Sequence, residues 1–136
     1  MEEGLEDRYL YETEAINRLI EDYMKHEKLI IAYDFDNTVR DYHNRGDTYP
    51  KVIELIKKAH QQGHTVVVYT ANVDLDFVKD YLIEEEIPFD AINQDVISPL
   101  MKTGKIYYNI LLDDRAGLAS AYRELSAALQ IIEEAF

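Results

Sequence analysis

Residues 29–38 read Leu29-Ile-Ile-Ala-Tyr-Asp34-Phe-Asp36-Asn-Thr38, a continuous apolar run that ends in two acids and a threonine. Such a run, without polar alternation, is typical of a strand buried on both faces of a parallel sheet. In open parallel α/β sheets, ligands bind beyond the carboxyl ends of the strands. The acids that follow this strand are therefore the first candidate site residues.

Strands and helices alternate along the rest of the chain. A helix that begins at Pro50 ends before Gly63, because proline suits the first helical position and glycine the end of a helix. The other expected elements are strands at 65–69, 89–93 and 108–112 and helices at about 73–86 and 116–135. Strands joined by crossover helices run parallel, so we expect an α/β fold, a three-layer α/β/α sandwich with a mainly parallel, Rossmann-like sheet.

The N-terminal segment is a separate feature. Apolar residues recur at helical spacing from Glu3 to about His26, which predicts an amphipathic helix. We expect residues 1–28 to be a helical extension and residues 29–136 to be one domain, since no linker or low-complexity tract interrupts them. The extension has three open roles: packing on the domain, substituting for a cap domain, or joining copies of the chain in a homo-oligomer.

The composition excludes several classes of protein. The formal net charge of −13 disfavours extended nucleic-acid binding and binding to anionic membranes, which both depend on clustered basic residues. The absence of cysteine excludes disulfides, thiolate metal sites and a thiol nucleophile. The acidic N-terminus is unlike a signal or transit peptide, so we expect a cytoplasmic protein.

The negative charge lies mainly outside the segments that carry the strand-end acids. Residues 29–71 hold five acids and five bases, and residues 96–117 hold two acids and three bases, so these two segments sum to +1. The remaining residues therefore carry −14. A small phosphate ester remains compatible with this distribution.

Polar residues follow three of the expected strands. Asp34 and Asp36 follow the first, Thr70 follows the second, and Asp113 with Asp114 follows the last. Each alone is better explained as a turn or helix cap. Four carboxylates at one edge repel one another, however, unless a cation compensates them. Mg²⁺ prefers oxygen ligands, so the group predicts a magnesium site.

The order of these residues resembles the haloacid dehalogenase superfamily. The family's first motif, Asp-x-Asp-x-Thr after an apolar strand, matches residues 34–38, and its second, a Thr or Ser that closes the next strand, matches Thr70. Its fourth motif, paired acids after an apolar strand, matches Asp113 and Asp114. The resemblance spans about residues 29–125.

The resemblance implies a role for each matched residue. Asp34 is expected to be the nucleophile, which forms an aspartyl phosphate, and Asp36 the general acid and base. Mg²⁺ is expected to bind the Asp34 carboxylate, the backbone carbonyl of Asp36 and Asp113, with Asp114 orienting a metal-bound water. Thr70 and backbone N–H groups near Ala71 are expected to bind the phosphoryl group.

The family's third motif, a lysine before the last motif, has two candidates. Lys105 lies closer than Lys102 to the last strand, and we favour it as the residue that neutralises charge on the phosphoryl group, leaving Lys102 as the alternative. The unselected lysine is expected to be a solvated surface residue.

Asp36 suits the phosphatase and mutase branches of the superfamily, so we expect a Mg²⁺-dependent phosphatase that acts on a small phosphorylated substrate. Thirteen residues separate Asp36 from Pro50, and 34 separate Thr70 from Lys105, which leaves no room for a cap domain. Two alternatives stay open: a phosphorylatable signalling domain, and a non-catalytic module that binds phosphate or metal. The substrate remains open, although Tyr42, His43, Arg45 and Tyr49 in the loop after the first motif are candidates for its recognition.

Overall fold

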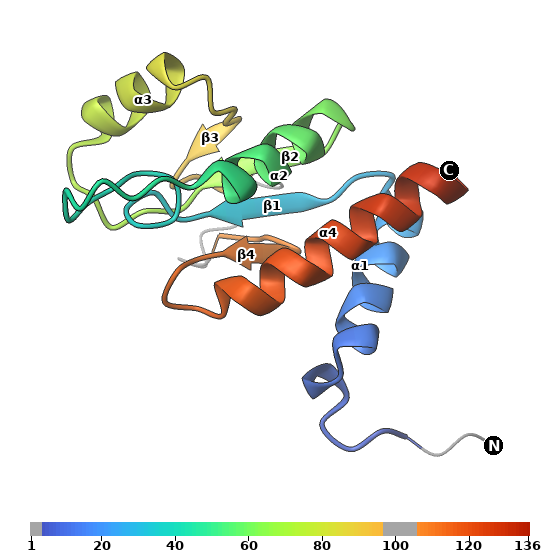
Figure 1. The fold of residues 1–136 in the computed structure, drawn as a ribbon. Helices are drawn as coiled ribbons and strands as arrows, with labels where there is room; N and C mark the ends of the chain where they lie inside the picture. The colour runs from blue at the N-terminus through green and yellow to red at the C-terminus, as the bar shows by residue number, and fades with distance from the viewer. Residues whose placement is uncertain (1–3, 97–105) are drawn as a thin grey trace.

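The computed structural model describes residues 4–96 and 106–136. Its centre is a sheet of four parallel strands in the order β3-β2-β1-β4 (Figure 1). The strands are β1 (Ile30–Tyr33), β2 (Thr65–Val68), β3 (Ala91–Ile92) and β4 (Ile110–Leu112). The mixed α/β class with a parallel sheet is therefore confirmed, and the arrangement is consistent with a three-layer α/β/α fold.

Strand β1 lies at the centre of the sheet because all four of its residues are apolar and buried. Ile31 is paired with Val66 of β2 on one side and with Ile110 of β4 on the other. The pairing continues past the strand, where the Asp34 N–H donates to the Leu112 carbonyl at 2.9 Å. This register brings the residues that follow β1 next to those that follow β4.

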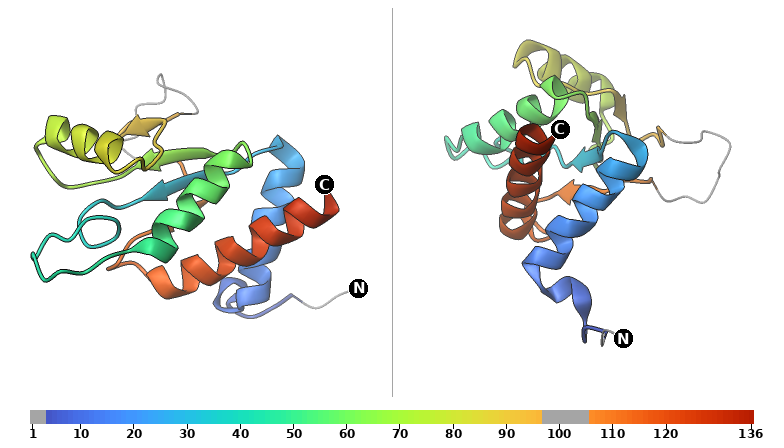
Figure 2. Two further views of the ribbon diagram at one scale, coloured as in Figure 1. Left: turned by 45° about the horizontal axis from the view of Figure 1, so that its top comes forward. Right: turned by 90° about the vertical axis from the view of Figure 1, so that its right-hand side faces the viewer.

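Helices α2 (Pro50–Gln61) and α4 (Leu118–Ala135) lie side by side over the sheet (Figures 1 and 2). Helix α2 has proline in its first turn, as predicted. Helix α4 follows Gly117, whose φ of 72° is a left-handed conformation that favours glycine. Leu125 and Leu129 of α4 are fully buried and belong to the common core.

Helix α3 (Leu75–Glu84) connects β2 to β3. The Asp74 carboxylate accepts a hydrogen bond from the Phe77 N–H at 3.1 Å, which satisfies one of the free donors at the start of the helix. Val78 and Leu82 of α3 are fully buried. The core therefore includes residues of both α3 and α4.

The predicted start of the N-terminal helix at Glu3 is wrong. Asp7 has a left-handed φ of 46°, and a short 3₁₀ helix (Arg8–Leu10) follows it, so α1 begins only at Glu12 and spans Glu12–His26. Helix α1 packs against α4, and its Leu19 is only 3% exposed within the common core. The boundary at residue 28 stays a prediction.

A buried histidine connects the start of β1 to the start of β2. The Leu29 N–H donates to His64 Nδ1 at 2.9 Å, and the His64 ring is edge-on to Tyr23 of α1. His64 is 3% exposed, and His60 lies in α2, where its Nε2 faces Asp90 at 3.7 Å. The two histidines thus have separate surroundings.

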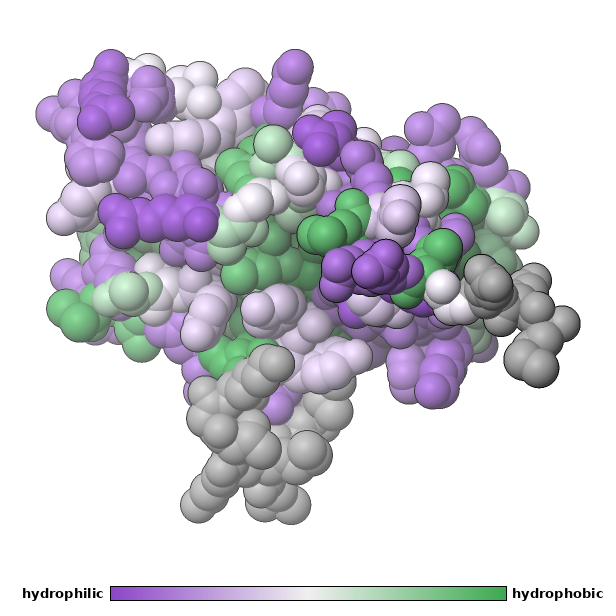
Figure 3. All heavy atoms as spheres, turned by 90° about the horizontal axis from the view of Figure 1, so that it is seen from below, coloured by the Kyte–Doolittle hydropathy of each residue, from purple (hydrophilic) through white to green (hydrophobic). Residues whose placement is uncertain are grey.

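Hydrophilic residues cover much of the face of the molecule that is seen from below (Figure 3). Seen from below, hydrophobic residues gather in the middle of this face (Figure 3). None of the helices in the described ranges combines the length and apolar character needed to cross a bilayer.

Candidate functional site

Three acids converge at the carboxyl ends of β1 and β4. Asp34 directly follows β1, and Asp113 and Asp114 follow β4. Each offers a carboxylate oxygen, and the three oxygens lie within 4.8 Å of one another. The parallel pairing of β1 with β4 produces this convergence, so the structure brings together three of the four predicted metal ligands.

The Thr38 hydroxyl lies between two of these acids. Its Oγ1 is 3.4 Å from Asp34 Oδ2 and 3.3 Å from Asp114 Oδ1, and it accepts the Asp114 N–H at 3.1 Å. Asn37 has a left-handed φ of 64°, and the chain turns back there so that Thr38 is fully buried. Thr38 belongs to the motif quoted above, but the sequence did not assign it to the site.

The surroundings of Asp34 raise its pKa well above the ordinary value, first through burial and then through the neighbouring acids. Burial raises the pKa of Asp34 to about 7, with further contributions from its hydrogen bond with Asp114 and the charge of Asp113, and the Phe35 N–H opposes the rise. Carboxylates this close repel one another unless a cation compensates them. All the donors are oxygens, so the cluster fits a hard divalent ion such as Mg²⁺.

The Asp36 side chain has different partners. Its Oδ1 receives a hydrogen bond from Arg40 Nη1 at 2.8 Å, and its Oδ2 receives one from Asn72 Nδ2 at 3.3 Å. Within the described residues, the cluster whose side chains could share an ion does not include Asp36. The predicted role of Asp36 in metal binding involved its backbone carbonyl, so it does not depend on this side chain.

The end of β2 supplies the other side of the site. The Thr70 N–H donates to Asn93 Oδ1 at 2.8 Å, and the Asn93 amide returns a hydrogen bond to the Thr70 carbonyl at 2.9 Å. Thr70 Oγ1 accepts the Asn72 N–H at 3.1 Å, which leaves its own hydroxyl hydrogen available to a ligand. In the part of the chain that the structure describes, the N–H of the exposed Ala71 donates to no protein acceptor.

These residues line one open cleft of about 740 Å³. It contains the predicted Asp34, Asp36, Thr70, Ala71, Asp113 and Asp114 and adds six residues that the sequence did not assign to the site, namely Asn37, Tyr42, Tyr69, Asn72, Val73 and Arg115. Among these six, Tyr42 is also one of the candidates for substrate recognition named from the sequence. The two candidate lysines, Lys102 and Lys105, lie outside the described residues.

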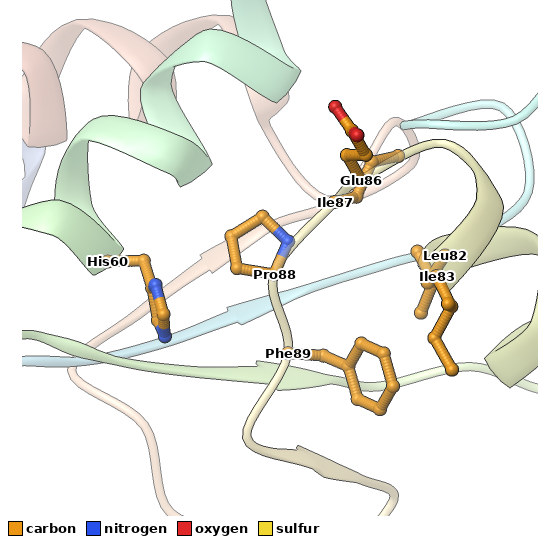
Figure 4. Close-up of a pocket in the computed structure, with 7 residues that line it drawn as sticks. All are labelled: His60, Leu82, Ile83, Glu86, Ile87, Pro88 and Phe89. Carbon is orange, nitrogen blue, oxygen red and sulfur yellow. The ribbon is translucent and has the colours of Figure 1, made fainter.

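A second hollow of about 300 Å³ lies between α2 and the segment that follows α3 (Figure 4). Its lining is mainly apolar, with His60 on one side and Leu82, Ile83 and Phe89 on the other. It shares no lining residue with the acidic cleft. The acidic cleft is thus the better candidate for chemistry.

Comparison with known proteins adds information on the fold alone. No protein-family model and no curated protein matches the chain. A solved structure, described as that of a conserved protein coded by a locus of Bacteroides thetaiotaomicron, is similar with a TM-score of 0.59. The similarity covers 80% of this chain and 93% of that chain at 22% identity. The likeness shows that the two chains share a fold.

Proposed function

We propose that this chain is a Mg²⁺-dependent phosphomonoesterase of the haloacid dehalogenase type, with Asp34 as its nucleophile. The observation that carries the proposal is the convergence of Asp34, Asp113 and Asp114 in one cleft with Thr70 and Ala71. The motif order supports it, because the nucleophile candidate follows the first strand and the paired acids follow the last.

The acidic cluster is the proposed magnesium site. Asp34, Asp113 and Asp114 supply oxygen ligands, and the fully buried Thr38 holds two of these acids in place. Bound Mg²⁺ supplies positive charge that offsets the carboxylates and the phosphoryl oxygens. That charge favours the ionised form of Asp34, which its neighbours disfavour in the free protein.

The first chemical step is attack by Asp34. A carboxylate oxygen of Asp34 forms a bond to phosphorus, and the bond between phosphorus and the ester oxygen breaks. The departing oxygen takes a proton from Asp36, which leaves a free alcohol and an aspartyl phosphate. The Thr70 hydroxyl and the Ala71 N–H are proposed to donate hydrogen bonds to the phosphoryl oxygens.

The second step regenerates the enzyme. Asp36, now ionised, takes a proton from a water molecule, whose oxygen attacks the phosphorus of the aspartyl phosphate. The bond between Asp34 and phosphorus breaks, and inorganic phosphate leaves. Phosphoryl transfer depends mostly on positioning and electrostatics, so a lysine at 105, or alternatively at 102, is proposed to complete the charge balance.

The open cleft suits a small substrate bound without a cap domain. Residues 37–49, all described, form no helix or strand beyond the isolated bridge between Asp36 and Arg40. The exposed Tyr42 and Tyr69 line the cleft and are candidates for contact with the alcohol part of the ester.

The proposal is tested by phosphate release from p-nitrophenyl phosphate and from a panel of phosphorylated metabolites. We expect turnover that requires Mg²⁺, stops in chelator and is lost in Asp34→Asn. Turnover in chelator or in Asp34→Asn contradicts the proposal. Stable phosphorylation of Asp34 without turnover indicates the phosphorylatable signalling domain instead.

A further inference from the structure

The Asp36 carboxylate is held at both of its oxygens. Arg40 Nη1 donates to Oδ1 at 2.8 Å, and Asn72 Nδ2 donates to Oδ2 at 3.3 Å. The Asp36 and Arg40 side chains are 23% and 26% exposed, so the pair is mostly shielded from water. A charge-assisted hydrogen bond with little exposure fixes a carboxylate more firmly than an exposed ion pair does.

Arg40 is itself fixed by the backbone and by aromatic rings. The Arg40 N–H donates to the Phe35 carbonyl at 3.1 Å, and the Arg40 carbonyl accepts the Asn37 N–H at 2.7 Å. The guanidinium lies 4.7 Å from the Phe77 ring centre and 5.8 Å from that of Phe35. Cation–π contact at these distances restricts the guanidinium, which therefore comes to Asp36 from a defined direction.

Asn72 is oriented by its own turn. Its Oδ1 accepts the Asp74 N–H at 2.9 Å, so the other atom of the amide, the donor Nδ2, faces Asp36. Its backbone N–H donates to Thr70 Oγ1 at 3.1 Å. Asn72 therefore connects the candidate phosphate ligand Thr70 to the candidate proton donor Asp36.

We infer that Arg40 and Asn72 are positioning residues that hold the Asp36 carboxylate where it can exchange a proton with the ester oxygen. The inference rests on the proposed function, because it assigns Asp36 the proton transfer. Neither residue needs to touch the substrate. Arg40 acts through Asp36 and couples it to α3 by the contact with Phe77.

Proton transfer to the ester oxygen matters most when the alcohol is a poor leaving group. The p-nitrophenolate anion leaves readily without a proton, whereas an alkoxide does not. Loss of Asp36 positioning is therefore expected to slow the first step, release of the alcohol, much more for an alkyl phosphate than for p-nitrophenyl phosphate. The second step, in which Asp36 is the proposed base, is the same for both esters, so the comparison is made on the first step alone. A general loss of folding or of metal binding slows both reactions alike.

The test compares wild type, Arg40→Met, Arg40→Lys and Asn72→Ala in single-turnover experiments with the protein in excess, which measure the rate constant for release of glycerol or of p-nitrophenolate in the first step. Because general acid catalysis typically contributes about 10²–10⁴-fold, we expect Arg40→Met to lower this rate constant for β-glycerophosphate by at least about 10-fold. For p-nitrophenyl phosphate we expect a loss of less than about 3-fold in the same rate constant. Arg40→Lys keeps the charge and is expected to recover part of the loss, and Asn72→Ala to show the same selectivity more weakly.

Arg115→Met is the matched control, because Arg115 lines the same cleft. Among the described residues, its only side-chain partner is Asp113, to which Arg115 donates its backbone N–H. This variant is expected to affect both esters equally. Equal losses on both esters in Arg40→Met, or no loss on either, overturn the positioning role when thermal unfolding shows the variant folded. If the wild-type protein hydrolyses neither ester, the result contradicts the proposed function and, with it, the positioning role of Arg40.

Discussion

Thr38 and Asp114 are joined by reciprocal contacts between two loops that are far apart in the sequence. The Asp114 N–H donates to Thr38 Oγ1 at 3.1 Å, and the same hydroxyl oxygen lies 3.3 Å from the Asp114 carboxylate. These contacts join the loop after β1 to the loop after β4, next to Asp34 and Asp113. We regard Thr38 as the structural support of the proposed magnesium site.

Thr38→Val tests this support with nearly unchanged side-chain volume. The variant loses the hydroxyl that accepts the Asp114 N–H, and loss of a hydrogen bond of this kind costs about 1–2 kcal/mol in the free energy of unfolding. Chemical denaturation measures the cost, and Mg²⁺ titration measures the expected fall in metal affinity. Thr65→Val is the control, because the Thr65 hydroxyl has no hydrogen bond to the described residues. We expect its free energy of unfolding to change by no more than about 0.5 kcal/mol. Equal stability of Thr38→Val and wild type contradicts the assignment.

Asp113→Asn tests the metal site directly. Loss of even an outer partner of a metal ligand typically lowers affinity about 10–100-fold, so loss of this carboxylate is expected to weaken Mg²⁺ binding by at least about 10-fold. Isothermal titration calorimetry of the full chain measures the affinity for Mg²⁺. Glu54→Gln is the control, because it removes one negative charge from the exposed face of α2, away from the acidic cluster. Its affinity for Mg²⁺ is expected to match that of wild type. Equal weakening in both variants indicates a nonspecific charge effect.

The raised pKa of Asp34 predicts how stability depends on pH without metal. Burial, Asp114 and Asp113 raise the pKa to about 7 from an ordinary value of 3.8, so the folded protein keeps a proton that the unfolded chain has lost. Raising the pH from about 4 to 7 therefore removes stability through this group. Thermal unfolding at several pH values should show that Asp34→Asn lacks this contribution to the loss of stability between about pH 4 and pH 7. Mg²⁺ should stabilise wild type more at pH 8 than at pH 5.5, and stabilisation independent of pH contradicts the site.

His64 predicts a pH dependence of the opposite sign. Burial lowers the pKa of His64 from its ordinary value of 6.5, and its Nδ1 is occupied by the Leu29 N–H. The unfolded chain protonates this histidine as the pH falls below about 6.5, whereas the folded chain resists, so stability is lost on acidification. In His64→Asn the amide oxygen can still accept the Leu29 N–H but does not titrate. Its stability is expected to fall less than that of wild type between pH 7.5 and 5, and equal falls contradict the prediction.

The sequence predicted the arrangement that depends on strand register. The apolar run of β1 and the acids after it imply a central parallel strand. Parallel pairing of β1 with β4 places Asp34 beside Asp113, independently of the loop conformations. The start of α1 was predicted too early because apolar spacing alone does not reveal that Asp7 adopts a left-handed conformation.

The partners of Asp36 were not predicted, because they depend on how the chain turns after β1. Asn37 takes a left-handed conformation, and this turn returns Arg40 to Asp36. Thr38 stood in the quoted motif, but its contact with Asp114 exists only once both loops are in place. The resemblance named the acids proposed to react, and the structure adds the side chains that hold them.

Covalent labelling of Asp34 tests the central claim most directly. Asp36→Asn keeps the nucleophile but lacks the base for hydrolysis, so with Mg²⁺ and p-nitrophenyl phosphate, whose leaving group needs no proton, we expect an aspartyl phosphate to accumulate. Acid quenching followed by peptide mass spectrometry should locate the phosphate on Asp34, with none in chelator or in the double variant that also carries Asp34→Asn. Phosphate on another residue, or turnover without any phosphorylated Asp34, would contradict the account.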